Sequence, residues 1–152
     1  HSACVTHEGK VLTWGEGKDM RLGYESAQEE GPRMVEGLEG ENVTSVTCGE
    51  RFTAALTDTG RVFTWGHAGG GLLGGANALG REVSSASDGA MPGVISVLED
   101  EGVEIIEISA GKTHMIALDS DGMVWSWGKG EYGRLGNGGS NHQLLPAPLG
   151  PF

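Results

Sequence analysis

Histidine is the side chain most often used as a general base, and His1 and His114 occupy matching places in similar stretches of this sequence. No Ser, Cys or carboxylate recurs with them in the pattern of a catalytic triad, and a third matching place holds Phe52. The other histidines stand singly in expected turns and lack the spacing of metal ligands. The sequence therefore predicts a packing and hydrogen-bonding role for His114, and it predicts neither catalytic nor metal-binding residues.

Acidic and glycine-rich segments match three other kinds of site only in part. Asp119-Ser120-Asp121-Gly122 begins like a calcium loop but lacks the downstream glutamate, so a hairpin turn is predicted. Gly128, Gly130 and Gly133 fit a dinucleotide fingerprint, yet glycines and prolines follow where that fingerprint requires a helix. The glycines from 69 to 75 lack the Gly-Lys-Ser/Thr ending of a phosphate-binding loop. No cofactor is predicted.

Charge limits the class of partner. Asp and Glu outnumber Lys and Arg by 21 to 10, a net charge of −11, and a surface of that sign repels phosphate backbones. Direct nucleic-acid binding is therefore not expected, and basic surfaces of other proteins are the natural partners. The acidic runs at 25–30, 36–41 and 99–104 are either solvated segments or an acidic rim for such a partner.

The apolar runs and the two cysteines bear on where the protein is found and on whether it contains disulfides. No apolar run approaches the roughly 20 residues of a membrane helix, so no membrane partner is expected. Cys4 and Cys48 stand where matching stretches have alanine, which favours buried small thiols over a disulfide framework. We expect an intracellular protein, in either the nucleus or the cytoplasm.

The matching stretches form an internal repeat. They begin at Ser2, Thr53 and Met115, and their Trp-Gly pairs are anchored at Trp14, Trp65 and Trp127, spaced by 51 and 62 residues. Each holds two short runs of β-forming residues joined by a turn that ends in glycine, at Gly9, Gly60 and Gly122. Further strands are predicted upstream, at 43–46 and 104–108. A period near fifty with about four strands per unit is typical of a propeller blade.

The repeats divide the whole chain, residues 1–152, into units of roughly 1–42, 43–102 and 103–152. Three blades cannot close a ring, because propellers need about four or more. The first unit also lacks an equivalent of residues 46–49 before His1. We expect a partial all-β propeller that belongs to a longer chain and packs against its remaining blades.

The residues around His114, then Asp121-Gly122, then Trp127 to Gly136 resemble the repeat of the regulator of chromosome condensation family. The resemblance covers almost the whole chain and implies a seven-bladed propeller. It also implies architectural roles at the repeat positions Gly9, Trp14, Gly15, Gly60, Trp65, Gly66, His114, Gly122, Trp127, Gly128, Gly133 and Gly136.

The second unit departs from the pattern. It ends at Leu73-Gly74 and then gains a connection, 75–91, that explains the 11 extra residues of the longer period. We expect this Ser-, Ala- and Gly-rich insertion to be a surface loop, either merely tolerated or partner-binding. In the second case Arg81, Glu82 and Asp88 are the candidate contacts, and deletion of 76–90 would weaken binding without unfolding the protein.

The resemblance implies three functions, of which we favour a non-catalytic scaffold for protein–protein interaction. The second is guanine-nucleotide exchange on a Ran-class small GTPase with chromatin association. The third is photoreception like that of the plant UV-B receptor, in which a Trp precedes the basic residue ahead of the histidine. Glu50 and Lys112 stand at that place here, which argues against photoreception.

Overall fold

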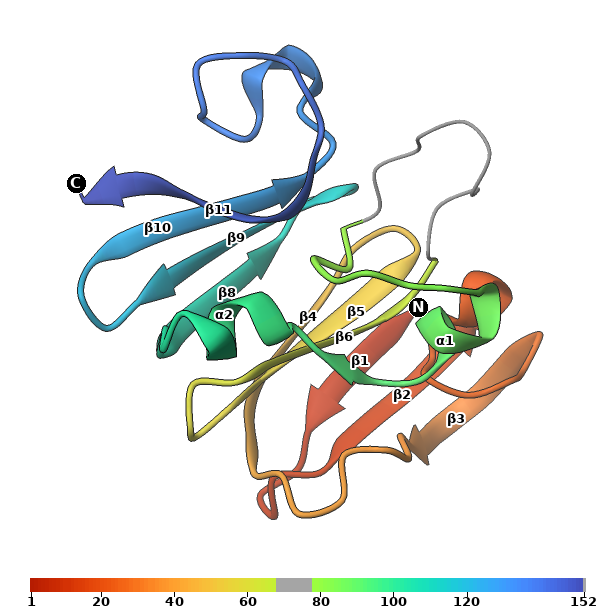
Figure 1. Cartoon of the computed structure of the whole chain (residues 1–152). Helices are drawn as coiled ribbons and strands as arrows, with labels where there is room; N and C mark the ends of the chain where they lie inside the picture. Colours follow the sequence, from red (N-terminus) through yellow and green to blue (C-terminus); the bar gives the residue numbers. More distant parts are fainter. Residues whose placement is uncertain (68–77, 152) are drawn as a thin grey trace.

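Three antiparallel sheets, one from each repeat, lie side by side like neighbouring propeller blades in the computed structural model, which describes residues 1–67 and 78–151 (Figure 1). The first sheet is β1 (Ser2–Val5), β2 (Val11–Glu16) and β3 (Gln28–Met34). The second is β4 (Val43–Cys48), β5 (Phe52–Thr57), β6 (Val62–Gly66) and β7 (Gly93–Val94). The third is β8 (Ile105–Ala110), β9 (His114–Asp119), β10 (Met123–Gly128) and β11 (Gln143–Pro151).

The helical segments are short and connect strands. They are η1 (Lys18–Met20), α1 (Ala86–Ala90), α2 (Ser96–Asp100) and η2 (Glu131–Gly133). Within the described parts of the chain, none has the length and apolar composition needed to cross a bilayer. The all-β prediction is confirmed, with one difference: the first sheet has three strands, and its β1 corresponds to β5 and β9 of the other sheets.

The hairpin turns form because a glycine occupies the left-handed region at the same place in each repeat. Gly9, Gly60 and Gly122 have φ of 71°, 77° and 83°. In the second hairpin the Gly60 amide donates to the Thr57 carbonyl at 3.1 Å, closing the turn. A Cβ at Gly60 would also lie 2.6 Å from Glu104 Cγ, so this turn can pack against the next repeat only as glycine.

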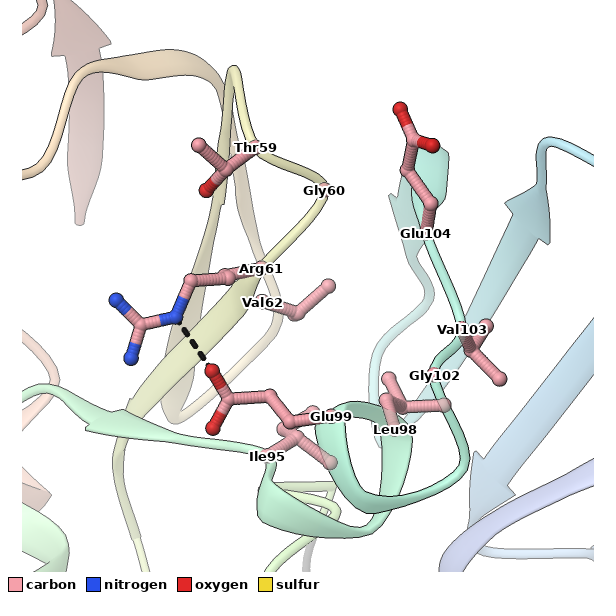
Figure 2. Close-up of a pocket in the computed structure, with 10 residues that line it drawn as sticks. All are labelled: Thr59, Gly60, Arg61, Val62, Ile95, Leu98, Glu99, Gly102, Val103 and Glu104. Atoms are coloured by element: carbon pink, nitrogen blue, oxygen red, sulfur yellow. Dashed lines mark hydrogen bonds and ion pairs between the residues drawn. The ribbon is translucent and has the colours of Figure 1, made fainter.

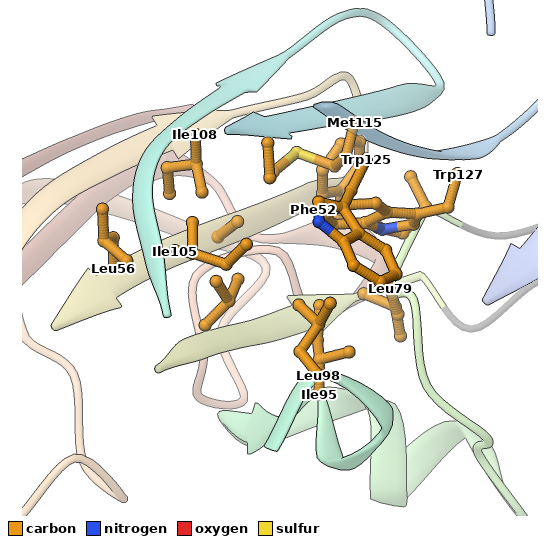
Figure 3. Packing of buried hydrophobic residues seen from close by; sticks show 14 residues of the cluster. Phe52, Leu56, Leu79, Ile95, Leu98, Ile105, Ile108, Met115, Trp125 and Trp127 are labelled. Atoms are coloured by element: carbon orange, nitrogen blue, oxygen red, sulfur yellow. The ribbon is translucent and has the colours of Figure 1, made fainter. Parts of the chain in front are cut away.

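Two apolar clusters fill the spaces between the sheets. The first and second sheets enclose Val11, Leu22, Tyr24, Val35, Leu38, Val43, Ala55, Phe63 and Trp65. The second and third sheets enclose a larger cluster that includes Phe52, Leu56, Leu79, Ile95, Leu98, Ile105, Ile108, Met115, Trp125 and Trp127 (Figure 3). The core of the protein therefore lies between blades, and each blade depends on its neighbour for stability.

Two of the three repeat tryptophans lie in these spaces between the sheets. Trp65 and Trp127 are fully buried, whereas Trp14 is only half-buried, because no sheet of the described structure covers its side of the first sheet. Trp127 Nε1 donates to the Ala78 carbonyl at 2.9 Å. A Cβ at Gly80 would lie 2.6 Å from this same Nε1, so the chain approaches the indole closely only where it has glycine.

The expected surface loop 75–91 is only partly at the surface. Residues 75–77 lie outside the described residues. Ala78 and Leu79 are buried, and Leu79 belongs to the larger cluster. The rest of the segment leads into α1 (Figure 1). Deletion of 76–90 would remove buried side chains such as Leu79, so the structure leads us to expect that this deletion destabilises the fold.

Trp127→Ala should destabilise the protein by about 3–5 kcal/mol, because it leaves a cavity and removes the hydrogen bond to the Ala78 carbonyl. Trp14→Ala is the matched control and should cost clearly less, since its indole is only half-buried. Urea unfolding monitored by circular dichroism measures both. Equal losses in the two variants would contradict inter-sheet burial as the source of the stability.

Candidate functional site

The connections between strands gather on two opposite faces. The loop face consists of the connections β2–β3, β4–β5, β6–β7, β8–β9 and β10–β11, that is, residues 17–27, 49–51, 67 and 78–92, 111–113, and 129–142. The turn face consists of the hairpin turns and the inter-sheet connections, residues 6–10, 35–42, 58–61, 95–104 and 120–122. Backbone bonds join neighbouring loops of the loop face, for instance the Glu50 amide to the Lys112 carbonyl at 2.9 Å.

In each repeat, the residue just before the tryptophan carries a buried hydroxyl that holds the following connection of the loop face in place. Thr13 Oγ1 donates to the Leu22 carbonyl at 2.7 Å, Thr64 Oγ1 to that of Leu79 at 2.6 Å, and Ser126 Oγ to that of Leu135 at 2.9 Å. In the second repeat the structural equivalent of Leu22-Gly23 and Leu135-Gly136 is therefore Leu79-Gly80. The expected pair, Leu73-Gly74, lies outside the described residues. Six of the extra residues precede the Leu-Gly step, and the other five follow it.

Arg81 ties the segment after this step to the second sheet. Its side chain is 9% exposed, and its NH2 group donates to the carbonyls of Thr64 at 3.2 Å, Asp88 at 3.1 Å and Met91 at 3.1 Å. Its Nε has no hydrogen-bond partner among the described residues. Burial lowers the pKa of Arg81, and the nearby carboxylate of Asp88 opposes that shift. Arg81 is therefore placed as an anchor of the loop.

The two acidic candidates lie outside that anchor. Glu82 is exposed. Asp88 is exposed too, but its carboxylate accepts hydrogen bonds from the Ser84 amide at 3.0 Å and the Ser84 hydroxyl at 3.1 Å, which lowers its pKa. The Ser85 hydroxyl in turn accepts from the Asp88 amide and begins α1. Of the three predicted contacts, Glu82 and Asp88 face solvent, whereas Arg81 does not.

Charges elsewhere on the loop face are paired with one another. Arg21, buried, donates to the carbonyls of Lys18 at 2.7 Å and Glu50 at 2.9 Å, so it joins the first repeat to the second. It also pairs with Asp19 at 3.0 Å, which lies 3.5 Å from His67 Nδ1. Arg134 takes the matching place in the third repeat and donates to the Thr113 hydroxyl at 2.9 Å. These pairs hold loops in place and leave few free cations on this face.

His114 lies where a ring packs onto a glycine. A Cβ at Gly111 would lie 2.0 Å from His114 Cε1, and a Cβ at Gly49 would lie 1.9 Å from Phe52 Cε1. Phenyl and imidazole rings therefore occupy the same site in two repeats. His114 Nδ1 is buried and has no hydrogen-bond partner among the described residues. The His114 ring is therefore packed against Gly111.

The hydrogen-bonding part is seen at His1, whose Nε2 lies 2.7 Å from Thr53 Oγ1. Thr53 Oγ1 also donates to the Arg21 carbonyl at 2.8 Å. The imidazole therefore bonds a hydroxyl that is already committed to the backbone, which is not the arrangement of a nucleophile and its base.

The segments that match cofactor and metal motifs have other structures. After Gly128 the chain enters η2 and then β11, and a Cβ at Gly130 would lie 1.9 Å from the Asn141 carbonyl oxygen. Asp119 accepts hydrogen bonds from the amides of Asp121 and Met123 and from Trp125 Nε1. In the described parts of the chain, no three His, Cys, Asp or Glu side chains gather as metal ligands.

Cys4 and Cys48 are free and half-buried, and burial raises the pKa of Cys48.

The comparisons with known proteins agree with this geometry. A family model for the regulator of chromosome condensation (RCC1) repeat matches residues 8–56, 59–118 and 121–152, and a second RCC1-repeat model matches 43–70 and 105–134. The chain belongs to the RCC1-repeat family. The resemblance found in the sequence is confirmed.

Relatives place these repeats in proteins of different kinds. The human E3 ubiquitin-protein ligase HERC2 is 35% identical over 149 residues, which are 96% of this chain and 3% of HERC2. The ultraviolet-B receptor UVR8 of Arabidopsis thaliana is 33% identical over 154 residues, which are 100% of this chain and 33% of UVR8. The chain thus spans a third or less of these two relatives.

Solved structures give the same fold. The yeast RCC1 protein Prp20, in its crystal structure with Kap60, has a TM-score of 0.79 at 22% identity, covering 100% of this chain and 36% of Prp20. A second structure of Prp20p from Saccharomyces cerevisiae, reported with its binding to Gsp1p and histones, has a TM-score of 0.73 at 22% identity, covering 99% and 36%. These likenesses establish the propeller fold for the present chain.

Replacing Arg81 by Met should destabilise the protein by about 1–3 kcal/mol, because the carbonyls of Thr64, Asp88 and Met91 lose their charged donor while the aliphatic stem is kept. Glu82→Gln, one residue away and exposed, should change stability by less than about 0.5 kcal/mol. Thermal unfolding compares the two variants. Hydrogen exchange across 84–91 should rise only in the Arg81 variant, and an unchanged exchange rate would refute the anchoring role.

His114→Phe should flatten the acid side of the stability profile. Burial and nearby Arg134 lower the pKa of His114, so as pH falls from about 7 to 5 the unfolded chain takes up a proton that the folded chain does not, and stability is lost. Phe cannot titrate and fits the same place in the second repeat. Denaturant unfolding at several pH values measures the difference, and parallel curves for variant and wild type would contradict it.

Proposed function

We propose that this chain is a non-catalytic scaffold for protein–protein interaction, working inside a larger protein or assembly. The observation that supports it most is the place of the repeats in the relatives. The region that matches this chain is 3% of the ubiquitin ligase HERC2 and 33% of the ultraviolet-B receptor UVR8, so proteins of different activity share these repeats. A module shared in this way contributes binding surfaces more naturally than a common reaction.

The structure supports the same proposal through its loops. The side chains that matched catalytic or metal motifs are committed to other groups of the fold: His1 bonds the Thr53 hydroxyl, and Asp119 accepts from the amides of Asp121 and Met123. The segment 81–92, which contains α1, lies beside η1 of the first repeat (Figure 1). Within this segment Glu82 and Ser87 are exposed, and Glu82 takes part in no ion pair among the described residues. A segment that Arg81 anchors in this way suits recognition of a protein surface.

Guanine-nucleotide exchange on a Ran-class small GTPase, with chromatin association, is the second candidate. It is supported by the likeness of fold to Prp20, whose binding to Gsp1p and histones is reported with its structure. The net charge of −11 argues against a direct contact with DNA. Exchange itself requires only a protein surface, so the two candidates differ in the partner and in what binding does to it.

Cross-linking mass spectrometry on the intact protein, isolated with its partners, separates these candidates. Under the scaffold proposal, subunits of an assembly are recovered, and Glu82→Lys with Ser87→Lys reduces their recovery several-fold by reversing the charge of the exposed part of the segment 81–92. Glu25→Lys with Ser26→Lys, elsewhere on the loop face, is the control. A single small GTPase whose nucleotide release is accelerated would overturn the scaffold proposal in favour of exchange.

A further inference from the structure

The far side of the third sheet, which faces away from the second sheet, is apolar and uncovered among the described residues. Met115 and Ala117 of β9 belong to the cluster between the second and third sheets, so the residue between them points to the far side. That residue, Ile116, is 37% exposed, and Ile106 of β8 is 54% exposed. In the second sheet the place of Ile116 is taken by Ala54, which is fully buried in the same cluster. A face that is covered in the second sheet is therefore open in the third.

Neighbouring sheets are joined by a bond from the first strand of one sheet to the hairpin turn of the preceding sheet. The Val43 amide donates to the Gly9 carbonyl at 3.1 Å, and the Ile105 amide donates to the Gly60 carbonyl at 3.1 Å. The second of these joints lies on the turn face beside a pocket of about 240 Å³, which Gly60 helps to line (Figure 2). The equivalent carbonyl of the third repeat, that of Gly122, accepts no hydrogen bond from the described residues.

A single hydroxyl also links the first sheet to the second. Thr53 Oγ1 is buried, donates to the Arg21 carbonyl at 2.8 Å and lies 2.7 Å from His1 Nε2. Because the only proton of the hydroxyl goes to the carbonyl, the hydroxyl accepts from His1 Nε2. The indole Nε1 of Trp65 is then left without a hydrogen-bond partner among the described residues. One donor and one acceptor of the first repeat thus hold one hydroxyl of the second.

The joint between the second and third sheets has apolar side chains at the same two places. Phe52 replaces the imidazole and Met115 replaces the threonine, and both belong to the cluster between these sheets (Figure 3). A thioether cannot donate, so the Ala78 carbonyl, equivalent to that of Arg21, accepts from Trp127 Nε1 at 2.9 Å instead. The ring and the residue that faces it are therefore matched, imidazole with hydroxyl and phenyl with thioether.

The far side of the third repeat has the donor and the acceptor of the first of these arrangements. The ring there is again a histidine, His114, and neither of its nitrogens has a hydrogen-bond partner among the described residues. Its Nδ1 is buried, so Nε2 is the nitrogen that another group can reach, as it is at His1. The Arg134 carbonyl takes the place of the Arg21 carbonyl and accepts no hydrogen bond from the described residues. This pair suits a hydroxyl and does not suit a thioether.

We propose that the far side of the third sheet binds a further blade of the same protein, and that this blade has serine or threonine at the place of Thr53. Its hydroxyl accepts from His114 Nε2 and donates to the Arg134 carbonyl, while its apolar side chains cover Ile106 and Ile116. Continuity with the two described joints favours a blade as the occupant. A blade of the same chain is favoured because the matched region is only 36% of Prp20 and 33% of UVR8. Such docking joins blades to one another and is independent of the scaffold function.

Exchange of the matched side chains tests the matching within this chain. His1→Phe and Thr53→Met, each alone, should lower the melting temperature by several degrees, because an apolar group then faces a polar one. Together they reproduce the arrangement of the second joint, in which Trp65 Nε1 can donate to the Arg21 carbonyl, so most of the loss should be recovered. Losses that simply add in the double variant would overturn the matching.

Photo-cross-linking in the intact protein identifies the docked blade. His114→benzoylphenylalanine places a light-activated ring on the far side, and His1→benzoylphenylalanine, which should link to β5 near Thr53, is the matched control. We expect position 114 to link to a further repeat of the same chain, beside a serine or threonine. A link to another protein, to a second copy distinguished by isotope labelling, or beside any other residue type would overturn the proposal. Absence of a link where the control succeeds would overturn it too.

Hydroxyl-radical footprinting of the intact protein avoids any substitution at His114. After correction for intrinsic reactivity, Ile106 and Ile116 should be oxidised several-fold less than Met34, which lies on β3 and is 55% exposed. Equal corrected rates would show that the far side is uncovered and would overturn the docking.

Discussion

Close contact between an indole and the backbone of the preceding blade is the constraint on which this structure depends. The Leu-Gly step of one repeat lies against the tryptophan of the next, at Gly23 with Trp65 and at Gly80 with Trp127. Any Cβ at those glycines would meet the ring within about 3 Å, a distance that real side chains avoid. Because the step must also point its carbonyl at a buried hydroxyl, both ends of the contact are fixed. The distance between neighbouring blades is then set by the geometry of the Leu-Gly step.

That constraint explains how the second repeat tolerates extra residues. The chain between Trp65 and Leu79 is longer than its equivalents between Trp14 and Leu22 or Trp127 and Leu135, yet Thr64 bonds Leu79 as Thr13 bonds Leu22. The hydroxyl sets where the step must be, and the surplus chain is accommodated on both sides of it, six residues before and five after. After the step, Arg81 fixes a second point through three carbonyls, so the following segment projects from a rigid base. Rigid projections lose little entropy on binding, which is an advantage for a recognition surface.

The strands, the hairpins and the repeat were predictable because each depends on residues that are close together in the sequence. Alternation around Val62 and Trp65 indicates a strand, and Gly60 can close its turn only with positive φ. The Leu-Gly step of the second repeat was misplaced, since Leu73-Gly74 satisfies the same local pattern and only the Thr64 hydroxyl distinguishes Leu79. Arg81 was predicted as a partner contact for a related reason. A long cationic side chain is usually exposed. Arg81 is buried because backbone carbonyls surround its guanidinium, and the positions of those carbonyls cannot be predicted from the sequence.

The turn face was beyond sequence reasoning because its features belong to no single repeat. Val62 comes from the second repeat's hairpin and Leu98 from the helix that leads into the third, so their pocket exists only once the blades are packed. The segregation of charge likewise depends on which end of the propeller each connection reaches. The acidic runs at 36–41 and 99–104 fall on the turn face, whereas the cations of the loop face are used to hold neighbouring loops together, as Arg21 does with Glu50. Most cations of the loop face are thus paired, whereas most carboxylates of the turn face have no cationic partner among the described residues. The two surfaces of the blade array therefore differ in chemistry, and the large excess of negative charge lies on the turn face alone.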